Sequence, residues 1–386
     1  QSIETILEAC DLKERGKLKA VVAVGCLVQR YKQDLQEEIP EVDLFMGLTE
    51  LKGLVPELRS RGLLPESETV PIMERPLRVL STETPHTSYL KISEGCDHTC
   101  AFCAIPLMRG LHRSQPVEEL VREAAGLGAQ GVKEINIVSQ DTTWYGRDAR
   151  RRDREAPLLP ELLRALIDGT DVAWYRLFYM YPSGITPEMV ELIASEARIV
   201  PYLDMPIQHG SDRMLQLMRR PERQETIRER VGWLRDAIPG LTLRTTVIVG
   251  FPGEQDDDFR EMLDLLEEIR FDRVGAFTYS VEAGTRAADM AGQLEQAVIN
   301  ERLEELMEVQ REISFEKNLD LIGQRTTALV DNLLDGDEDF VAVARTVAQA
   351  HEVDGVTNLI GLEGTAGIEP GSMIEVEIVD ALDYDL

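Results

Sequence analysis

The hydrophobic pattern between residues 88 and 292 is a regular alternation of short apolar runs with longer amphipathic stretches. The apolar runs predict buried strands at 89–93, 134–140, 174–181, 202–208, 241–251 and 273–280. The amphipathic stretches predict helices at 117–127, 158–167, 187–195, 212–218, 222–237 and 254–269. This alternation favours an α/β fold, a parallel sheet curved into a partial (β/α)6 barrel. In such barrels the functional groups lie at the carboxyl ends of the strands.

The preceding residues predict the remainder of another α/β domain, residues 1–75. Helical periodicity covers 2–12, and the apolar runs at 20–24 and 43–47 are typical of buried parallel strands. A linker is expected at 76–87, where prolines and threonines interrupt the pattern. The chain begins with Gln1 and not with methionine, so we expect an amino-terminal piece to be absent.

A different pattern follows the barrel. Residues 293–320 predict one long, charged, amphipathic helix that connects to the last domain. In residues 321–386, short apolar runs such as 327–330 and 373–378 alternate with Gly and Asp turns. This pattern predicts a small all-β domain, an OB-like barrel of about five strands.

Composition and length limit the number of domains and the class of protein. The chain has 386 residues, of which 43% are hydrophobic, which is enough for two or three domains with real cores. No run of about eighteen apolar residues is present, which excludes a membrane span, and no signal peptide opens the chain. Five cysteines, three of them clustered, argue against a disulfide scaffold and favour a reducing, cytoplasmic location.

The charge is strongly acidic. The formal net charge is −29, from 41 basic and 70 acidic residues. Residues 321–386 hold only two bases, Arg325 and Arg345, against fourteen acids, and only two aromatics, Phe340 and Tyr384. Such a surface repels an RNA backbone and attracts a basic protein, so we expect a basic partner and no RNA. The alternative is a solvated acidic face that serves only solubility.

The most informative stretch is the cysteine loop, residues 93–103. Cys96, Cys100 and Cys103 follow the first predicted strand with the spacing C-x3-C-x2-C. Thiolates favour iron–sulfur clusters or zinc, and a structural zinc site needs four protein ligands. Three ligands on a 4Fe–4S cluster leave one iron open, where S-adenosylmethionine can bind and be cleaved to a 5′-deoxyadenosyl radical. The alternatives are a zinc site completed by His98 or His112, and three buried cysteines without a ligand.

The cysteine loop resembles that of the radical S-adenosylmethionine superfamily. The wider run from Tyr89 to Ser114 is more narrowly similar to the methylthiotransferases. This resemblance implies a radical S-adenosylmethionine barrel at 88–292, the remainder of a methylthiotransferase domain before it, and a TRAM domain at 321–386. It also implies two 4Fe–4S clusters, S-adenosylmethionine and a reducing protein as electron donor.

Cys26 is the expected ligand of the second cluster. The run around Gly25-Cys26-Leu27 follows a predicted strand and resembles the end of the methylthiotransferase amino-terminal domain, which normally supplies three cysteines. Only the third has a match in this chain, because Cys10 lies within a predicted helix and matches no family ligand. We therefore expect the second cluster to be incomplete in this chain.

Polar residues follow several other predicted strands. Contacts to S-adenosylmethionine are expected from Gln140, Asp141, Gln208, Arg244, Gly250 and Glu254. The resemblance implies that the turn after the second strand holds the amino group of the cofactor. Glycine at position 250 would let a flat group such as adenine approach the backbone. Each of these residues is individually also explained as a turn or a cap.

Two branches of the methylthiotransferases share this architecture. Four motifs resemble the protein-modifying branch, namely 140–143 with Tyr145-Gly146, 179–182, 204–209 and 279–282. The resemblance implies addition of a methylthio group to the β-carbon of an aspartate in ribosomal protein S-twelve. The alternative is methylthiolation of isopentenyl-adenosine in transfer RNA. A third hypothesis, of another class, is an acidic adaptor whose cluster is only structural.

Overall fold

The computed structural model describes residues 2–65, 80–334, 339–361 and 367–386. These residues form two compact units. The first contains 2–65 together with Gly95–His98 and Ala104–His112, and the second contains 80–94, Thr99–Cys103 and the described residues from Arg113 onward. Residues 76–79 of the predicted linker, and residues 66–75 at the end of the predicted first domain, lie outside the described residues.

The first unit is a small α/β structure. Its elements are α1 (Ser2–Glu14), β1 (Val22–Val24), α2 (Cys26–Glu38), β2 (Leu44–Met46), η1 (Leu48–Gly53), α3 (Leu54–Ser60) and α4 (Ile105–Arg109). The two strands are parallel, with Ala23 opposite Phe45. Buried side chains of α1 and α2, including Cys10, Val28 and Leu35, pack with these strands. The predicted helix and both predicted strands of this region are therefore present.

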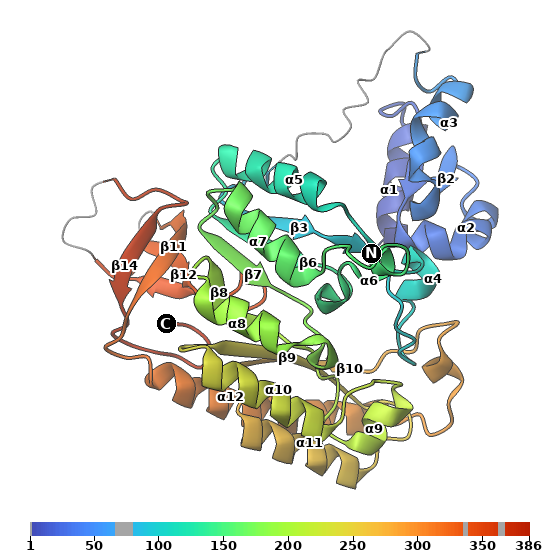
Figure 1. Cartoon of the computed structure of the whole chain (residues 1–386). Coiled ribbons are helices and arrows are strands. Elements are labelled where there is room, and N and C mark those ends of the chain that lie inside the picture. The colour runs from blue at the N-terminus through green and yellow to red at the C-terminus, as the bar shows by residue number, and fades with distance from the viewer. Residues whose placement is uncertain (1, 66–79, 335–338, 362–366) are drawn as a thin grey trace. The chain divides into compact units, whose positions relative to one another are not determined.

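The second unit is built on a six-stranded parallel sheet (Figure 1). Its strands lie in chain order, β3 (Thr87–Lys91), β6 (Glu134–Val138), β7 (Trp174–Leu177), β8 (Ile199–Asp204), β9 (Thr242–Val249) and β10 (Arg273–Thr278). The connecting helices are α5 (Val117–Ala129), α7 (Leu159–Gly169), α8 (Pro187–Ser195), α9 (Asp212–Leu217), α10 (Gln224–Ala237) and α11 (Asp256–Ile269). This order confirms the predicted partial barrel of six βα repeats.

All six predicted strands end earlier than the apolar pattern indicates, and three of them end shortly before a residue with positive φ. The predicted strand 174–181 stops at Leu177, 202–208 stops at Asp204, and 241–251 stops at Val249. In each case a residue with positive φ follows within a few positions: Tyr179 (φ 55°), Gln208 (φ 70°) and Gly250 (φ 79°). A left-handed backbone cannot continue a strand, so these residues turn the chain at the carboxyl end of the sheet.

The chain leaves the barrel through α12 (Gln296–Leu319) and enters the C-terminal domain. Its strands β11 (Arg325–Leu333), β12 (Ala342–Thr346), β13 (Thr357–Leu359) and β14 (Met373–Glu377) form an antiparallel sheet in the order β13-β12-β11-β14. The described residues thus hold four strands, against the about five that were predicted. A β-bulge interrupts the pairing of β11 with β12 between Val330 and Asn332, which leaves Asp331 outside the ladder.

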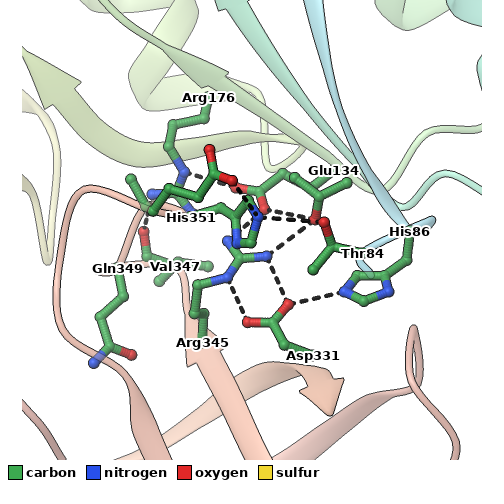
Figure 2. Close-up of polar contacts among 12 residues, drawn as sticks. Thr84, His86, Glu134, Arg176, Asp331, Arg345, Val347, Gln349 and His351 are labelled. Atoms are coloured by element: carbon green, nitrogen blue, oxygen red, sulfur yellow. Dashed lines mark hydrogen bonds and ion pairs between the residues drawn. The ribbon is translucent and has the colours of Figure 1, made fainter. Parts of the chain in front are cut away.

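The C-terminal domain is packed against the parallel sheet through an apolar patch and a buried charge cluster. Leu329 and Ala350 lie in one buried cluster with Trp174 and Tyr202 of the sheet. Figure 2 shows the charge cluster, which consists of His86, Glu134, Arg176, Asp331 and Arg345. None of the helices in the described part of the chain is long and apolar enough to cross a bilayer.

Candidate functional site

The cysteine loop follows the first strand of the parallel sheet. After β3 the chain forms the two-residue strand β4 (Ser93–Glu94), which pairs antiparallel with β5 (Arg113–Ser114). The loop between β4 and β5 carries Cys96, Cys100 and Cys103. The sequence predicted neither β4 nor β5. Their pairing closes the base of the loop, and along the chain the loop follows the carboxyl end of β3, the end of a strand where a barrel of this type holds its functional groups.

Within the first unit, the first residues of the cysteine loop, 95–98, are hydrogen-bonded to the segment 104–112 that follows the cysteines. Cys96 is buried, and its N–H donates to the carbonyl of Gly110 at 3.1 Å. The Oδ1 of Asp97 accepts a hydrogen bond of 2.9 Å from the backbone of His112. Gly95 has φ +76°, and a Cβ there would lie 2.3 Å from the carbonyl oxygen of Leu111. Only glycine fits this position, because it combines a left-handed backbone with close approach of another chain segment.

Within the second unit, the backbone of Ala101, near the end of the cysteine loop, is hydrogen-bonded to two other segments of the chain. The Ala101 N–H donates to Met218 O at 2.9 Å, and Ala101 O accepts from the Ala287 N–H at 2.8 Å. The ring of Phe102 packs edge-on against Phe251 with a centroid distance of 6.5 Å. Cys100 is buried and Cys103 is half-buried. The backbone that carries these two cysteines is therefore fixed by the protein itself.

Arg220 and Tyr181 lie beside Cys100, and the sequence did not single out either residue as part of the cysteine site. The Tyr181 hydroxyl is 3.8 Å from Cys100 Sγ. The guanidinium of Arg220 stacks on the ring of the same Tyr181, at 3.8 Å from its centroid. Burial by itself would lower the pKa of Arg220, but Tyr181, Glu222 and Cys100 together raise it above its ordinary value. A permanent positive charge therefore adjoins one of the three thiols.

The polar residues after β6 form a tight turn. Asp141 is buried, and its Oδ1 accepts a hydrogen bond of 2.6 Å from Thr143 Oγ1. The Asp141 N–H donates to Ser139 Oγ at 3.3 Å, and the Ser139 hydroxyl in turn contacts that of Ser93. Gln140 is half-buried in the same turn. The turn is thus bonded to the residue that begins β4, directly before the cysteine loop.

Arg244 lies among acidic groups. Its Nη1 donates to Asp204 Oδ1 at 2.8 Å and to Thr246 Oγ1 at 3.2 Å, and its Nε is 3.6 Å from Asp354 Oδ1 in the C-terminal domain. Burial opposes its charge, but Asp204 and its other neighbours outweigh burial and raise the pKa of Arg244. The expected contact of Arg244 with S-adenosylmethionine stays a prediction, and the guanidinium already has these partners.

Gln208 and Tyr179 take up the left-handed backbone conformation after their strands. The Gln208 N–H donates to Thr246 O at 2.9 Å and its carbonyl accepts from Ile248 N at 2.8 Å, so β9 holds it in place. The N–H of Tyr179 donates to Asp204 Oδ2 at 3.2 Å, while its side chain is exposed. Non-glycine residues with positive φ cost free energy and concentrate at functional sites. Tyr179 belongs to the motif 179–182 that the sequence singled out, and its left-handed conformation became visible only in the structure.

Gly250 and Glu254 belong to one buried network. The Gly250 N–H donates to Glu254 Oε2 at 2.9 Å, and Arg302 Nη1 donates to Glu254 Oε1 at 2.6 Å. His209 Nε2 lies 3.3 Å from the same carboxylate. A Cβ on Gly250 would lie 2.5 Å from the side chain of Ile299 in α12. The glycine thus makes room for α12, and a contact with adenine stays a prediction.

Cys26 is the first residue of α2, directly after the left-handed Gly25. Its thiol is half-buried, and Arg109 Nη2 lies 3.7 Å from its sulfur. Cys10, in contrast, is buried in the middle of α1, and burial raises the pKa of its thiol. Cys10 therefore contributes to packing, and its place within a helix is as predicted.

The chemistry of the cysteines fits an iron–sulfur cluster. Within residues 2–65, 80–334, 339–361 and 367–386, no three cysteine, histidine, aspartate or glutamate side chains converge as they would around a metal ion. The geometry therefore does not distinguish a zinc site completed by His98 or His112 from an iron–sulfur cluster. The chemistry of the donor atoms favours the cluster. Three thiols within eight residues, one of them beside a guanidinium, suit a negatively charged cluster of iron and sulfide.

Comparison with known families agrees with this chemistry. Residues 90–266 match the Radical SAM superfamily, and residues 322–386 match the TRAM domain. The superfamily implies a 4Fe–4S cluster and S-adenosylmethionine as cofactors. Among solved structures, the cobalamin-dependent S-adenosylmethionine radical enzyme OxsB has the same fold over 80% of this chain and 46% of its own, with 15% identity and a TM-score of 0.54.

Two curated relatives match the whole chain. The ribosomal protein uS12 methylthiotransferase RimO of Anaeromyxobacter sp. (strain K) is 45% identical over 100% of this chain and 81% of its own length. The enzyme of the same name from Geobacter sulfurreducens is 39% identical over 100% of this chain and 86% of its own. Since this similarity extends through both units and the C-terminal domain, the chain belongs to the RimO family of radical S-adenosylmethionine methylthiotransferases.

Proposed function

We propose that this chain adds a methylthio group to the β-carbon of an aspartate in ribosomal protein uS12. The observation that carries the proposal is the continuous similarity to RimO enzymes across the complete chain, including the cysteine loop after β3. The substrate is taken from the name of those relatives. The C–H bond at that carbon is not acidic enough for a side-chain base, so the reaction needs a radical.

Each part of the chain has a role in this proposal. Cys96, Cys100 and Cys103 hold the first cluster, which with S-adenosylmethionine supplies the radical that removes the hydrogen. Cys26 would be one ligand of a second cluster, which would supply the methylated sulfur, and the other cysteines expected for that cluster have no match in this chain. The polar groups at the strand ends, which are Gln140, Asp141, Gln208, Arg244, Gly250 and Glu254, bind the cofactor or hold the turns that bind it. Because Glu254 is bonded to Gly250 and Arg302, it acts by fixing its turn.

The C-terminal domain is proposed to bind the basic substrate protein. Of its two arginines, Arg345 is buried, and Arg325 pairs with Glu377 at 3.1 Å. Exposed carboxylates include those of Asp339, Glu352, Glu369, Glu375, Glu377 and Asp380. Such a surface attracts a basic protein and repels the phosphates of RNA. The burial of Arg345 therefore favours uS12 over transfer RNA.

The redox requirements indicate a reducing compartment. All five cysteines lie in the described residues, and no disulfide joins any of them. Reduction of a low-potential cluster needs an electron donor, for which we propose a small reducing protein. These requirements are met in the cytoplasm, where thiols are kept reduced.

The test is a pair of parallel incubations. The anaerobically reconstituted protein is supplied with S-adenosylmethionine and dithionite, and with either uS12 or transfer RNA. We expect uS12 to gain the mass of one methylthio group and the RNA to stay unchanged. A gain on the RNA alone would replace this proposal with the transfer-RNA reaction. Tight binding of uS12 without release of 5′-deoxyadenosine would support the adaptor hypothesis.

A further inference from the structure

Arg220 is placed by the same turn that holds the cysteine loop. Helix α9 ends at Leu217, and Arg219 adopts a left-handed conformation with φ 59°. The N–H of Arg220 then donates to Leu215 O at 2.8 Å, while the carbonyl of Met218 accepts the N–H of Ala101. The guanidinium and the backbone next to Cys100 are therefore anchored to a single rigid helix end.

The guanidinium itself has little freedom. It is stacked on the ring of Tyr181, its Nη2 donates to the carbonyl of Pro206 at 2.9 Å, and its Nε is 3.1 Å from the carboxylate of Glu222. Glu222 is fully buried and accepts a hydrogen bond of 3.0 Å from Ser183. With only 3% of Arg220 exposed, solvent screens its charge weakly. The Tyr181 ring on which this fixed cation is stacked carries its hydroxyl 3.8 Å from the sulfur of Cys100, so the charge lies next to that thiol.

A buried cation beside a cluster thiolate has a defined consequence. One-electron reduction makes an iron–sulfur cluster more negative, and a nearby positive charge stabilises that state more than the oxidised state. Hydrogen bonds to the ligating sulfurs and exclusion of solvent are among the factors that set the reduction potential of such clusters. Arg220 provides the charge at a position from which solvent is excluded.

We propose that Arg220 is a positioning residue whose fixed charge beside Cys100 raises the reduction potential of the cluster held by Cys96, Cys100 and Cys103. The inference rests on the proposed function, because it requires the cluster. Its role is electrostatic and geometric, and no contact of Arg220 with the substrate is involved. Tyr181 is the platform on which the guanidinium is held.

The test is a redox titration of the reconstituted protein, followed by the electron paramagnetic resonance signal of the reduced cluster. The variants are Arg220→Gln, which removes the charge, and Arg220→Lys, which keeps the charge and loses the planar stack. The matched control is Arg219→Gln, which removes the same charge from an exposed side chain one residue away. Circular dichroism and iron content are measured on every sample, so that a folding defect is recognised.

We expect Arg220→Gln to lower the ratio of reduced to oxidised cluster at a fixed potential about tenfold, which is about 59 mV for a one-electron couple. Arg220→Lys should give a smaller decrease, and Arg219→Gln should match the wild type. Equal midpoint potentials in all four proteins would overturn the inference, as would loss of iron from Arg219→Gln equal to that from Arg220→Gln. A wild-type protein that binds no cluster would instead refute the proposed function.

Discussion

The guanidinium of Arg345 donates a hydrogen bond of 2.5 Å to the carboxylate of Glu134, 211 residues earlier in the chain. The same guanidinium donates from Nε to Asp331 Oδ2 at 2.7 Å, and Glu134 also accepts from Arg176 Nε at 2.7 Å. Both Glu134 and Arg345 are at most 1% exposed. One arginine thus joins the antiparallel sheet of the C-terminal domain to the parallel sheet (Figure 2).

Replacing Arg345 should therefore destabilise the second unit. Arg345→Met leaves the carboxylates of Glu134 and Asp331 buried with fewer partners, and removal of one partner from a buried ion pair costs about 3–5 kcal/mol. Urea unfolding followed by circular dichroism measures the change. The matched control is Arg325→Met, because the Arg325 side chain is 79% exposed and its pair with Glu377 contributes at most about 1 kcal/mol. Equal effects of the two substitutions would contradict this prediction.

Stability of the second unit should fall in acid. Burial opposes the charge of Asp331, but hydrogen bonds from His86 and Arg345 outweigh burial and lower its pKa. Burial likewise opposes the charge of Glu134, and Arg176 and Arg345 lower its pKa. For carboxyls with a depressed folded pKa, the stabilisation is present above the unfolded values of about 3.9 and 4.3, and it is lost as the pH falls through the folded values.

Urea midpoints measured from neutral pH to about pH 3 check this dependence, since unfolded carboxyls protonate near pH 4. We expect the urea concentration at the unfolding midpoint of the wild type to decrease once the pH is below about 4. For Asp331→Asn, this urea concentration should be lower at neutral pH and should depend less steeply on pH in acid. Asp380→Asn, which changes an exposed aspartate of the same domain, should keep the wild-type slope. A slope for Asp331→Asn as steep as that of the wild type would show that this carboxylate does not contribute.

Substitution of Gly95 should disrupt the cysteine loop. Gly95→Ala places a Cβ 2.3 Å from the carbonyl oxygen of Leu111 on a backbone with φ +76°. The adjacent Cys96 must then move, so we expect reduced iron incorporation on reconstitution. The matched control is Gly110→Ala, where φ is +74° and nothing lies within 4 Å of the new Cβ. The control should cost about 1–3 kcal/mol of backbone strain, because φ +74° with ψ −163° is a conformation that glycine alone adopts readily, and it should bind iron normally.

The cysteines should differ sharply in their effect on cofactor binding. We expect Cys100→Ala to abolish the iron–sulfur absorbance and to reduce cleavage of S-adenosylmethionine to the level of iron-free protein, because a cubane needs its three thiolates. Cys10→Ala, which alters a buried thiol within the core of the first unit, should retain both properties. Persistent cleavage by Cys100→Ala under reducing conditions would refute the assignment of this ligand.

Much of the fold was predictable because it depends on local periodicity. All six strands of the parallel sheet and the helices between them follow from apolar runs and amphipathic stretches. Their ends were less predictable, because Tyr179 and Gln208 turn the chain with a left-handed backbone that their residue types do not indicate. The short strands β4 and β5 and the helix α4 were missed because elements of two to five residues carry almost no periodic signal.

The site was predictable to the extent that it is contiguous. Cys96, Cys100 and Cys103 are recognisable because their spacing is written in eight successive residues. Arg220 was missed because it lies 120 residues after Cys100, and only the folded chain brings its guanidinium to that sulfur. Gly250 was interpreted as space for a flat ligand, which stays a prediction, and the folded chain shows that the absence of a Cβ at this position also makes room for Ile299.

The sequence by itself determined the order of the domains, the cluster-binding motif and the acidic character of the C-terminal domain. Only the tertiary structure decided which charges remain on the surface. Arg345 and Asp331 count as one base and one acid in the sequence, yet both are buried where the C-terminal domain meets the parallel sheet. The reason is that periodicity and spacing are local properties, whereas the burial and partner of a charge depend on segments that meet only when the chain folds.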